Sequence, residues 1–293
     1  MPIESSIVGS SGEPLVHEID ARWTMAYASG LGDAIPCYLD TLRPRGVAAH
    51  PLFPVCFEWP VMLELRRELR GASMTAEEDV RAIHATHDLI AYRLVRPGDR
   101  VTTRATIVGV ERRKPGAFLT VRFDTVDSNG APVCETWEGV IYRDVEVTGP
   151  DRPATEAPRL PTAAKTNGSA RAEIPIPIST VAAHVYTECA RIWNPVHTDA
   201  ADAAAAGLPA ILLHGTATLA LAVSRIVEVE AGNDPERVER AAGRFAGMVL
   251  MPSEIRLRIL SRETSGGVDG VFFEVLNAEG QRAIRDGFVG LRS

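Results

Sequence analysis

The sequence lacks the features that would place the protein in a membrane or in an oxidising compartment. No run of about 18 apolar residues is present, and residues 1–12 have neither the basic start nor the apolar centre of a secretion signal. The 4 cysteines among 293 residues form no CxxC pair, so we expect reduced thiols that pack as small hydrophobic side chains. These absences predict a cytoplasmic protein.

An excess of positive charge and the glycine-rich motifs of nucleotide-binding proteins are also lacking. The chain has 31 Lys and Arg against 38 Asp and Glu, which argues against nucleic acid or an anionic membrane surface as the partner. No GxGxxG, GxxxxGKS/T or GxSxG motif occurs, so neither nucleotide binding nor serine hydrolase chemistry is indicated. On a regular strand His84 and His87 would point to opposite faces, which disfavours a metal site. We therefore expect no cofactor and no metal.

Side chains suited to proton transfer are concentrated in one stretch, residues 191–199. Asn194-Pro195 ends the helical pattern that precedes it, because proline lacks a backbone donor and disfavours helix in the residue before it. His197 is then predicted to lie on a turn. An imidazole held there, with an ordinary pKa near 6.5, suits proton transfer at neutral pH.

Two helices are predicted after this turn. Thr198 or Asp199 can cap a short helix over residues 200–206. A longer helix over residues 216–229 is so apolar that it must be surrounded by protein. Its first free amides, near Gly215, would favour a developing oxyanion. A histidine beside such a helix start is a usable active site.

Tyr186, residues 193–197 and residues 212–215 occur in an order and spacing that resemble the hydratase 2 motif of the MaoC-like dehydratases, the (R)-specific enoyl-CoA hydratases. The resemblance implies an α+β fold of the hot-dog type, in which a curved antiparallel sheet wraps a long central helix. It also implies a thioester of coenzyme A or of acyl carrier protein as the substrate, no cofactor, and assembly as a homodimer.

By resemblance, the family divides its chemistry among an aspartate, a histidine and a glycine amide. His197 and Gly215 match the histidine and the glycine, and Asn194 would orient the histidine or the attacking water. Counting back from Asn194, the aspartate position falls on Ile192 and the preceding glycine position on Arg191, so the catalytic aspartate is missing. The residues expected to contact the substrate are Tyr186, Arg191, Ile192, Trp193 and His214.

Three carboxylates could replace the missing aspartate. Glu188 lies one helical turn before Ile192 and would project from the same face, so we favour it as a catalytic residue. Asp199 lies two residues after His197, and Asp88 could approach from the first half of the chain. An apolar Ile192 would instead exclude water from the site or hold part of a branched acyl chain.

A weak internal repeat indicates that the chain contains two copies of one helix-and-sheet unit. Residues 95–101 are similar to residues 250–256, with a proline at the same place in each. We therefore predict a double hot-dog. Its first unit, residues 1–146, lacks the motif and shapes the acyl pocket, residues 147–172 form a linker, and residues 173–293 carry the motif. The two sheets should form one continuous antiparallel layer.

The first half has weaker local patterns. Apolar spacing predicts a helix over residues 15–31 and a short amphipathic helix over residues 61–70, while four prolines predict a loop over residues 44–60. Alternation of apolar and polar residues then predicts an antiparallel meander between residues 80 and 142.

The leading hypothesis is an enoyl-thioester hydratase or dehydratase with an altered catalytic pair, in which His197 is the principal acid and base. The alternative is a hot-dog protein that binds acyl thioesters and uses His197 alone for isomerisation, cyclisation or thioester hydrolysis. A third hypothesis is a catalytically inactive subunit that supplies one pocket wall to a partner.

Overall fold

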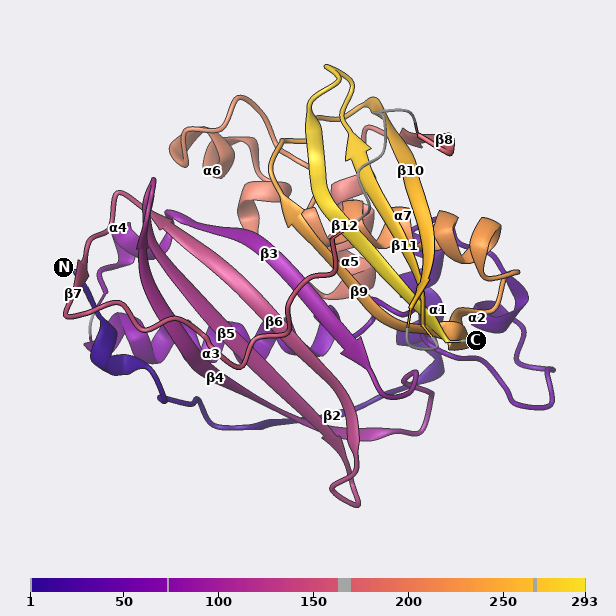
Figure 1. Ribbon diagram of the computed structural model, residues 1–293, viewed down its shortest axis with the longest axis horizontal. Helices are drawn as coiled ribbons and strands as arrows, with labels where there is room; N and C mark the ends of the chain where they lie inside the picture. Colours follow the sequence, from indigo (N-terminus) through magenta and orange to yellow (C-terminus); the bar gives the residue numbers. More distant parts are fainter. Residues whose placement is uncertain (1, 73, 163–169, 266–267, 293) are drawn as a thin grey trace.

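The computed structural model describes residues 2–72, 74–162, 170–265 and 268–292, and its main feature is a single ten-stranded antiparallel sheet with helices behind it (Figure 1). The strands are β2 (Leu15–Glu18), β3 (Ala82–Ala91), β4 (Arg100–Arg113), β5 (Gly116–Asp127), β6 (Pro132–Arg143), β8 (Ala172–Ile178), β9 (Val238–Phe245), β10 (Ser253–Ser265), β11 (Val268–Leu276) and β12 (Arg282–Arg292). Their order is β2-β4-β5-β6-β3-β9-β12-β11-β10-β8. A separate pair, β1 (Ile3–Glu4) and β7 (Val147–Thr148), is parallel.

The second half of the sheet repeats the first. The order β2-β4-β5-β6-β3 corresponds to β8-β10-β11-β12-β9, and each set of five strands wraps one long helix, α3 (Val55–Ala72) or α7 (Gly215–Glu230). This is the α+β double hot-dog that the sequence predicts, with β3 and β9 joining the two sheets into one layer. The predicted linker, residues 147–172, is described except for residues 163–169.

The predicted helix over residues 15–31 is wrong in its first part. Residues Leu15–Glu18 form strand β2, which pairs with the start of β4, and helix α1 covers only Ala21–Gly30. Asp20 starts this helix because its side chain accepts a hydrogen bond from the Trp23 amide at 2.7 Å. Pairing with a neighbouring strand overrode the local helical pattern, because four residues on an edge gain more from the ladder than from one turn of helix.

The predicted loop over residues 44–60 is also too long, because α3 begins at Val55 and contains Pro60. A proline inside a helix costs about 3 kcal/mol. Val55, Cys56 and Phe57 are all buried, and full burial of a large apolar side chain contributes about 1.5 to 3 kcal/mol. Burial of this first turn therefore offsets the lost hydrogen bond.

The helical predictions for the second half are confirmed. Helix α5 (Ala182–Ala190) ends before Asn194-Pro195, and a short 3₁₀ turn, η2 (Pro195–His197), follows. Helix α6 (Ala200–Ala205) is capped by Asp199, whose carboxylate accepts hydrogen bonds from the amides of Ala201 and Asp202. The remaining short elements are η1 (Ser5–Ile7), α2 (Pro36–Leu39), α4 (Ala76–Asp79) and η3 (Pro235–Arg237).

The two halves share a hydrophobic core. Helices α1 and α5 lie against each other, and Tyr27 and Tyr186 meet there with their hydroxyl oxygens 3.4 Å apart. Leu89 of β3 and Ala241 of β9 belong to the same buried cluster. All 4 cysteines are free, as expected. None of the helices in the described residues has the length and apolar character needed to cross a membrane.

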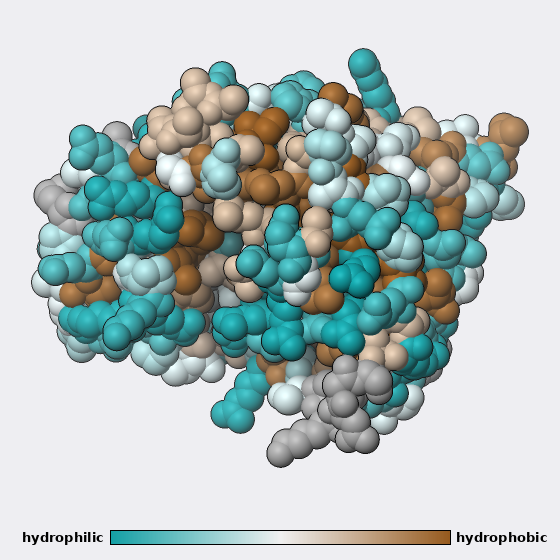
Figure 2. Space-filling model, turned by 90° about the horizontal axis from the view of Figure 1, so that it is seen from above, coloured by the Kyte–Doolittle hydropathy of each residue, from teal (hydrophilic) through white to brown (hydrophobic). Residues whose placement is uncertain are grey.

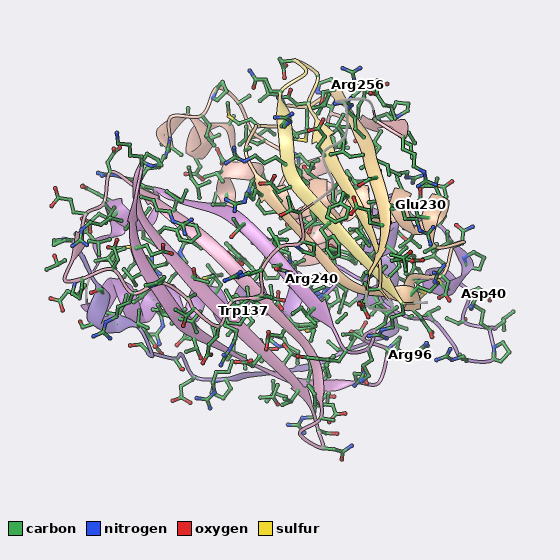
Figure 3. The ribbon with its side chains drawn as sticks, in the orientation of Figure 1. Asp40, Arg96, Trp137, Glu230, Arg240 and Arg256 are labelled. Carbon is green, nitrogen blue, oxygen red and sulfur yellow. The ribbon has the colours of Figure 1, made fainter. Side chains whose placement is uncertain are left out.

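An ion pair spans the junction between the two halves. The Arg240 guanidinium of β9 donates to both carboxylate oxygens of Asp88 on β3, at 2.8 and 2.6 Å, and the two side chains are 17% and 10% exposed. Figure 3 places Arg240 on the front of the sheet, on the side away from the helices. Such a two-pronged pair in a largely buried place stabilises the junction and fixes its register.

Removing the Arg240 guanidinium should lower the free energy of unfolding by about 2 kcal/mol, because Asp88 would keep a charge in a largely buried place without its partner. Arg240→Met keeps most of the aliphatic side chain, and urea unfolding measures the loss. Arg225→Met is the control, since Arg225 pairs with Glu228 on the surface of α7, and about 0.5 kcal/mol or less is expected there. Equal losses would contradict a structural role for the junction pair.

Candidate active site

A cavity of about 120 Å³ lies where the two halves meet. The second half contributes the η2 turn and the start of α7, and the first half contributes α3, β3 and β6. The face seen in Figure 2 is hollowed, and hydrophobic side chains are visible inside the hollow. The polar residues that line the cavity are Glu58, Arg66, His84, His87 and Glu138 from the first half and Asn194, His197, His214 and Thr216 from the second.

His197 is held in one tautomer by the backbone. Its Nδ1 lies 3.0 Å from the Leu212 carbonyl oxygen, which can only accept, so Nδ1 carries the proton. The other nitrogen, Nε2, is then free to accept a proton from a group in the cavity. Burial lowers the pKa of His197 below its ordinary value, although the Leu212 hydrogen bond opposes part of the effect. At neutral pH the ring is neutral and can act as a base.

His214 supports the His197 ring. The two rings are stacked, with centroids 3.7 Å apart and planes inclined by 25°. Nε2 of His214 lies 3.3 Å from the Thr187 hydroxyl oxygen on α5. Burial lowers the pKa of His214 well below its ordinary value, so this ring does not compete for protons.

Gly215 begins α7 and lies on the cavity wall. The amides of the first turn have no carbonyl partner within the helix, so they and the helix dipole favour negative charge beside them. A Cβ atom at Gly215 would lie 3.1 Å from the Phe245 ring, which explains why glycine stands here. The helix start can therefore hold a developing oxyanion, as the sequence predicts.

Tyr186 lies behind this helix start rather than on the cavity wall. Its hydroxyl donates to the Thr216 hydroxyl at 3.1 Å, and only 1% of the residue is exposed. The Thr216 side chain does line the cavity. Tyr186 thus acts on the site through Thr216, whereas the resemblance had suggested direct contact with the substrate.

Ile192 and Arg191 are the residues that the resemblance aligns with the family's aspartate and glycine. Ile192 is 5% exposed and lines the cavity with His197. Arg191 ends α5 with a backbone φ angle of 59°, in the left-handed conformation that favours glycine. Its guanidinium lies 4.2 Å from the centre of the Trp23 ring, outside the residues that line the cavity. This cation–π contact offsets part of the backbone strain.

The carboxylates proposed to replace the aspartate lie elsewhere in the described structure. Glu188 and Asp199 line a second cavity together with Trp193, which is 61% exposed, and Asn194 borders both cavities. Asp199 also caps α6, and Asp88 is held by Arg240.

Polar groups from the first half also line the cavity, and the sequence patterns do not predict them. Strand β3 has a bulge between His84 and Thr86, so His84 lies opposite Val140 and His87 opposite Glu138. The expectation that the two histidines point to opposite faces is therefore wrong. Their ring centroids are 5.4 Å apart, and His84, His87 and Glu138 each place one nitrogen or oxygen within 4.8 Å of the other two.

Burial keeps these first-half groups uncharged at neutral pH. It raises the pKa of Glu58 and that of Glu138 to about 8, and it lowers the pKa of His84 to about 4. The pKa of His87 also falls well below its ordinary value. The cavity thus combines carboxylic acids from one half with a neutral histidine base from the other.

A signal for the two glutamates is present in the sequence. Glu58 interrupts the apolar run Val55-Cys56-Phe57, and Glu138 shares one strand face with Thr136 and Val140. A carboxylate at an inward position is costly unless it is paired or functional. For Glu58 the signal has no meaning in a predicted loop over residues 44–60, because an inward position is defined only once α3 is known to begin at Val55.

Each half of the chain matches one family model. Residues 161–279 match the MaoC like domain, and residues 6–136 match the FAS1-like dehydratase domain region. A segment of 85 residues, which is 29% of the chain, is 33% identical to the fatty acid synthase beta subunit pkiC of Emericella nidulans. The matched segment covers 4% of that protein. A segment of 102 residues, which is 34% of the chain, is 30% identical to the peroxisomal enoyl-CoA hydratase 2 of Arabidopsis thaliana. The matched segment covers 31% of that protein. The chain therefore spans less than a third of the length of either relative.

Solved structures share the whole architecture. The MaoC-like dehydratase of Phytophthora capsici has a TM-score of 0.81 at 18% identity, over 98% of each chain. A Mycobacterium tuberculosis protein described as a double hot-dog has a TM-score of 0.62 at 16% identity, over 97% of this chain and 96% of that one. At such identities the likeness establishes the fold.

Two substitutions of Arg191 should separate backbone strain from the contact with Trp23. Arg191→Ala removes the cation–π contact and keeps a Cβ in the left-handed conformation, so we expect a loss of about 1 kcal/mol. Arg191→Gly removes the contact and the strain together, so its unfolding free energy should be about 1 kcal/mol above that of the alanine variant. Urea unfolding measures both. A glycine variant no more stable than the alanine variant would rule out strain at this residue.

Proposed function

We propose that this chain, a double hot-dog protein with a MaoC-like domain in its second half and a FAS1-like dehydratase region in its first, hydrates enoyl thioesters or dehydrates the corresponding 3-hydroxyacyl thioesters. The observation that carries the proposal is the arrangement at the cavity. A neutral His197 with a free Nε2 and the unpaired amides at the start of α7 face the same cavity.

The chemistry follows from this arrangement. The thioester carbonyl oxygen lies against the first amides of α7, which stabilise the enolate oxygen that forms when the double bond is attacked. His197 Nε2 removes a proton from water as its oxygen bonds to the β carbon, and Asn194 orients that water. A proton must also reach the α carbon. Dehydration is the reverse sequence, with His197 protonating the departing hydroxyl.

The substrate is a thioester of coenzyme A or of acyl carrier protein. The cavity of about 120 Å³ has room for the reacting end of an acyl chain. Apolar side chains from both halves, including Met62, Val140 and Ile192, line this space. They exclude bulk water and strengthen the electrostatic interactions of the site.

The domain organisation belongs to the same proposal. Residues 1–146 form a unit without the motif that shapes the acyl pocket, residues 147–172 link the units, and residues 173–293 carry His197. Assembly as a homodimer and a cytoplasmic location follow from the resemblance and from the composition, and they stay predictions.

One observation favours a second candidate. The resemblance aligns Ile192 with the family's aspartate, and this apolar side chain lines the cavity, which favours a dry site in which His197 alone moves a proton during isomerisation, cyclisation or thioester hydrolysis. Loss of the enoyl absorbance with crotonyl-CoA separates hydration from these reactions.

His197→Ala should reduce kcat for crotonyl-CoA hydration by about 100-fold to 10,000-fold, because it removes the positioned base. The melting temperature should fall only slightly, since the ring contributes one hydrogen bond, to the Leu212 carbonyl, and its contact with His214. His184→Ala is the control, because His184 is exposed and lies outside this cavity. In the wild type, activity should fall as the pH drops through the lowered pKa of His197. Full activity of His197→Ala would exclude the proposed mechanism.

Ile192→Asp should raise crotonyl-CoA hydration, because it places a carboxylate where the family has one. Burial of the new charge will lower the unfolding free energy, by about 1 to 3 kcal/mol. Ile192→Asn is the control for shape, and it should cost similar stability without raising the rate. Equal rates in the two variants would show that a carboxylate at residue 192 does not assist the reaction.

A further inference from the structure

We propose that Glu138, on β6 of the first half, is the catalytic acid that works with His197 in place of the aspartate missing at Ile192. This inference rests on the proposed function and adds to it a residue from the opposite wall of the cavity.

The strand geometry directs Glu138 into the cavity. Its neighbour Trp137 pairs with Asp88, and Figure 3 places Trp137 on the front of the sheet, so Glu138 points to the side where the helices lie. The Glu138 side chain is 16% exposed and borders the same space as His197 and Gly215. It is therefore accessible to a small group bound there.

No cation among the described residues pairs with this carboxyl group. The nearest basic atom is Nε2 of His84, at 3.8 Å from a Glu138 oxygen. Arg66 also lines the cavity, but it is held by Asp79, with the Arg66 Nε at 2.6 Å from the carboxylate. A largely buried carboxyl group without a cationic partner is costly in a purely structural role, and this favours a role in chemistry.

A short series of contacts connects the two walls. The His84 ring packs edge-on against Phe245 with centroids 4.8 Å apart, and Phe245 lies against Gly215. On the other side of Gly215, His214 stacks on His197. The cavity wall that carries Glu138 and the wall that carries His197 thus lie on either side of the start of α7, where the thioester carbonyl is proposed to bind.

Glu58 is the other carboxyl group on this cavity, and it fits the role less well. It is 3% exposed, and its Oε1 already accepts a hydrogen bond from the Thr136 hydroxyl at 2.6 Å. Glu138 has no such partner among the described residues, so its proton is available for transfer.

The charges around Glu138 favour the protonated acid. The groups that face it are His84 and His87 from β3, Glu58 and Arg66 from α3, and His197 and His214 from the second half. Burial is the largest effect and raises the pKa of Glu138 to about 8, while Arg66 opposes part of it. At pH 7 the acid is protonated and His197 is neutral, which is the state that hydration requires.

The hydration step balances with these two groups. His197 Nε2 takes one proton from water as the water oxygen bonds to the β carbon. The π electrons of the double bond move to the α carbon, which receives the Glu138 proton. This leaves an imidazolium and a carboxylate, and transfer of the proton back to Glu138 restores the resting state.

Glu138→Gln should reduce kcat for crotonyl-CoA hydration by about 100-fold to 10,000-fold, with KM nearly unchanged. The glutamine resembles the neutral acid in shape, so the melting temperature should not fall. Glu135→Gln is the matched control, because Glu135 lies on the same strand outside the cavity, and it should retain the wild-type rate. A full rate in Glu138→Gln, or a large loss in Glu58→Gln with none in Glu138→Gln, would overturn the assignment.

A rescue experiment and a pH profile test the role directly. In the wild type, the rate should decline as the pH rises through about 8, because the acid loses its proton. In Glu138→Gln the decline near pH 8 should vanish, because the titrating acid is gone, and Glu138→Asp, which keeps a carboxyl group at this position of β6, should recover part of the lost rate. Failure of this rescue, together with an unchanged decline in Glu138→Gln, would overturn the proposal.

The outcomes separate this inference from the proposed function. If wild-type protein hydrates the thioester, His197→Ala does not, and Glu138→Gln does, the proposed function stands and the Glu138 assignment falls. If the wild type processes no enoyl thioester, both fall. Loss of the wild-type rate after dialysis against EDTA would also overturn the assignment, because Glu138 would then act through a metal rather than as an acid.

Discussion

The pairing of β3 with β9 is the constraint on which the site depends. These two strands turn two hot-dog units into one sheet, and the Asp88–Arg240 ion pair fixes their register. As a result, the wall formed by β3 and β6 faces the η2 turn and the start of α7. Residues from both halves line the cavity, so the complete cavity exists only where the two units are joined.

Burial at this junction also sets the protonation of the groups involved. Removal from water disfavours charge on Glu58, Glu138, His84 and His197 alike, so the acids keep their protons and the imidazoles lose theirs. The raised acid pKa values have a consequence for stability. The two glutamates ionise near 4.5 in the unfolded chain, so their contribution to stability is complete below that pH and is lost as the pH rises through about 8.

Local patterns predicted much of the second half and less of the first. The Asn194-Pro195 stop, the Asp199 cap and the apolar run of α7 depend on nearby residues, and each was identified from the sequence. The predicted helix is shorter than α3, because the burial that offsets the cost of Pro60 comes from packing against residues distant in the sequence. His84 and His87 share a face only because of a bulge, and a bulge is set by pairing with β6, which no short pattern records.

Arg191 and Ile192, which the resemblance aligns with a glycine and an aspartate, have one common physical consequence for the site. A glycine and an aspartate at these positions would place a carboxylate on the same short turn as His197, whereas here the turn presents an apolar surface to the cavity. In the proposed reaction, proton transfer then requires a partner from another wall, and β6 carries the carboxyl group of Glu138 on the inward face of the sheet. Because that partner is fixed by a strand rather than by a loop, its position depends on the whole sheet, and any change that loosens the β3–β9 junction should weaken catalysis as well as folding.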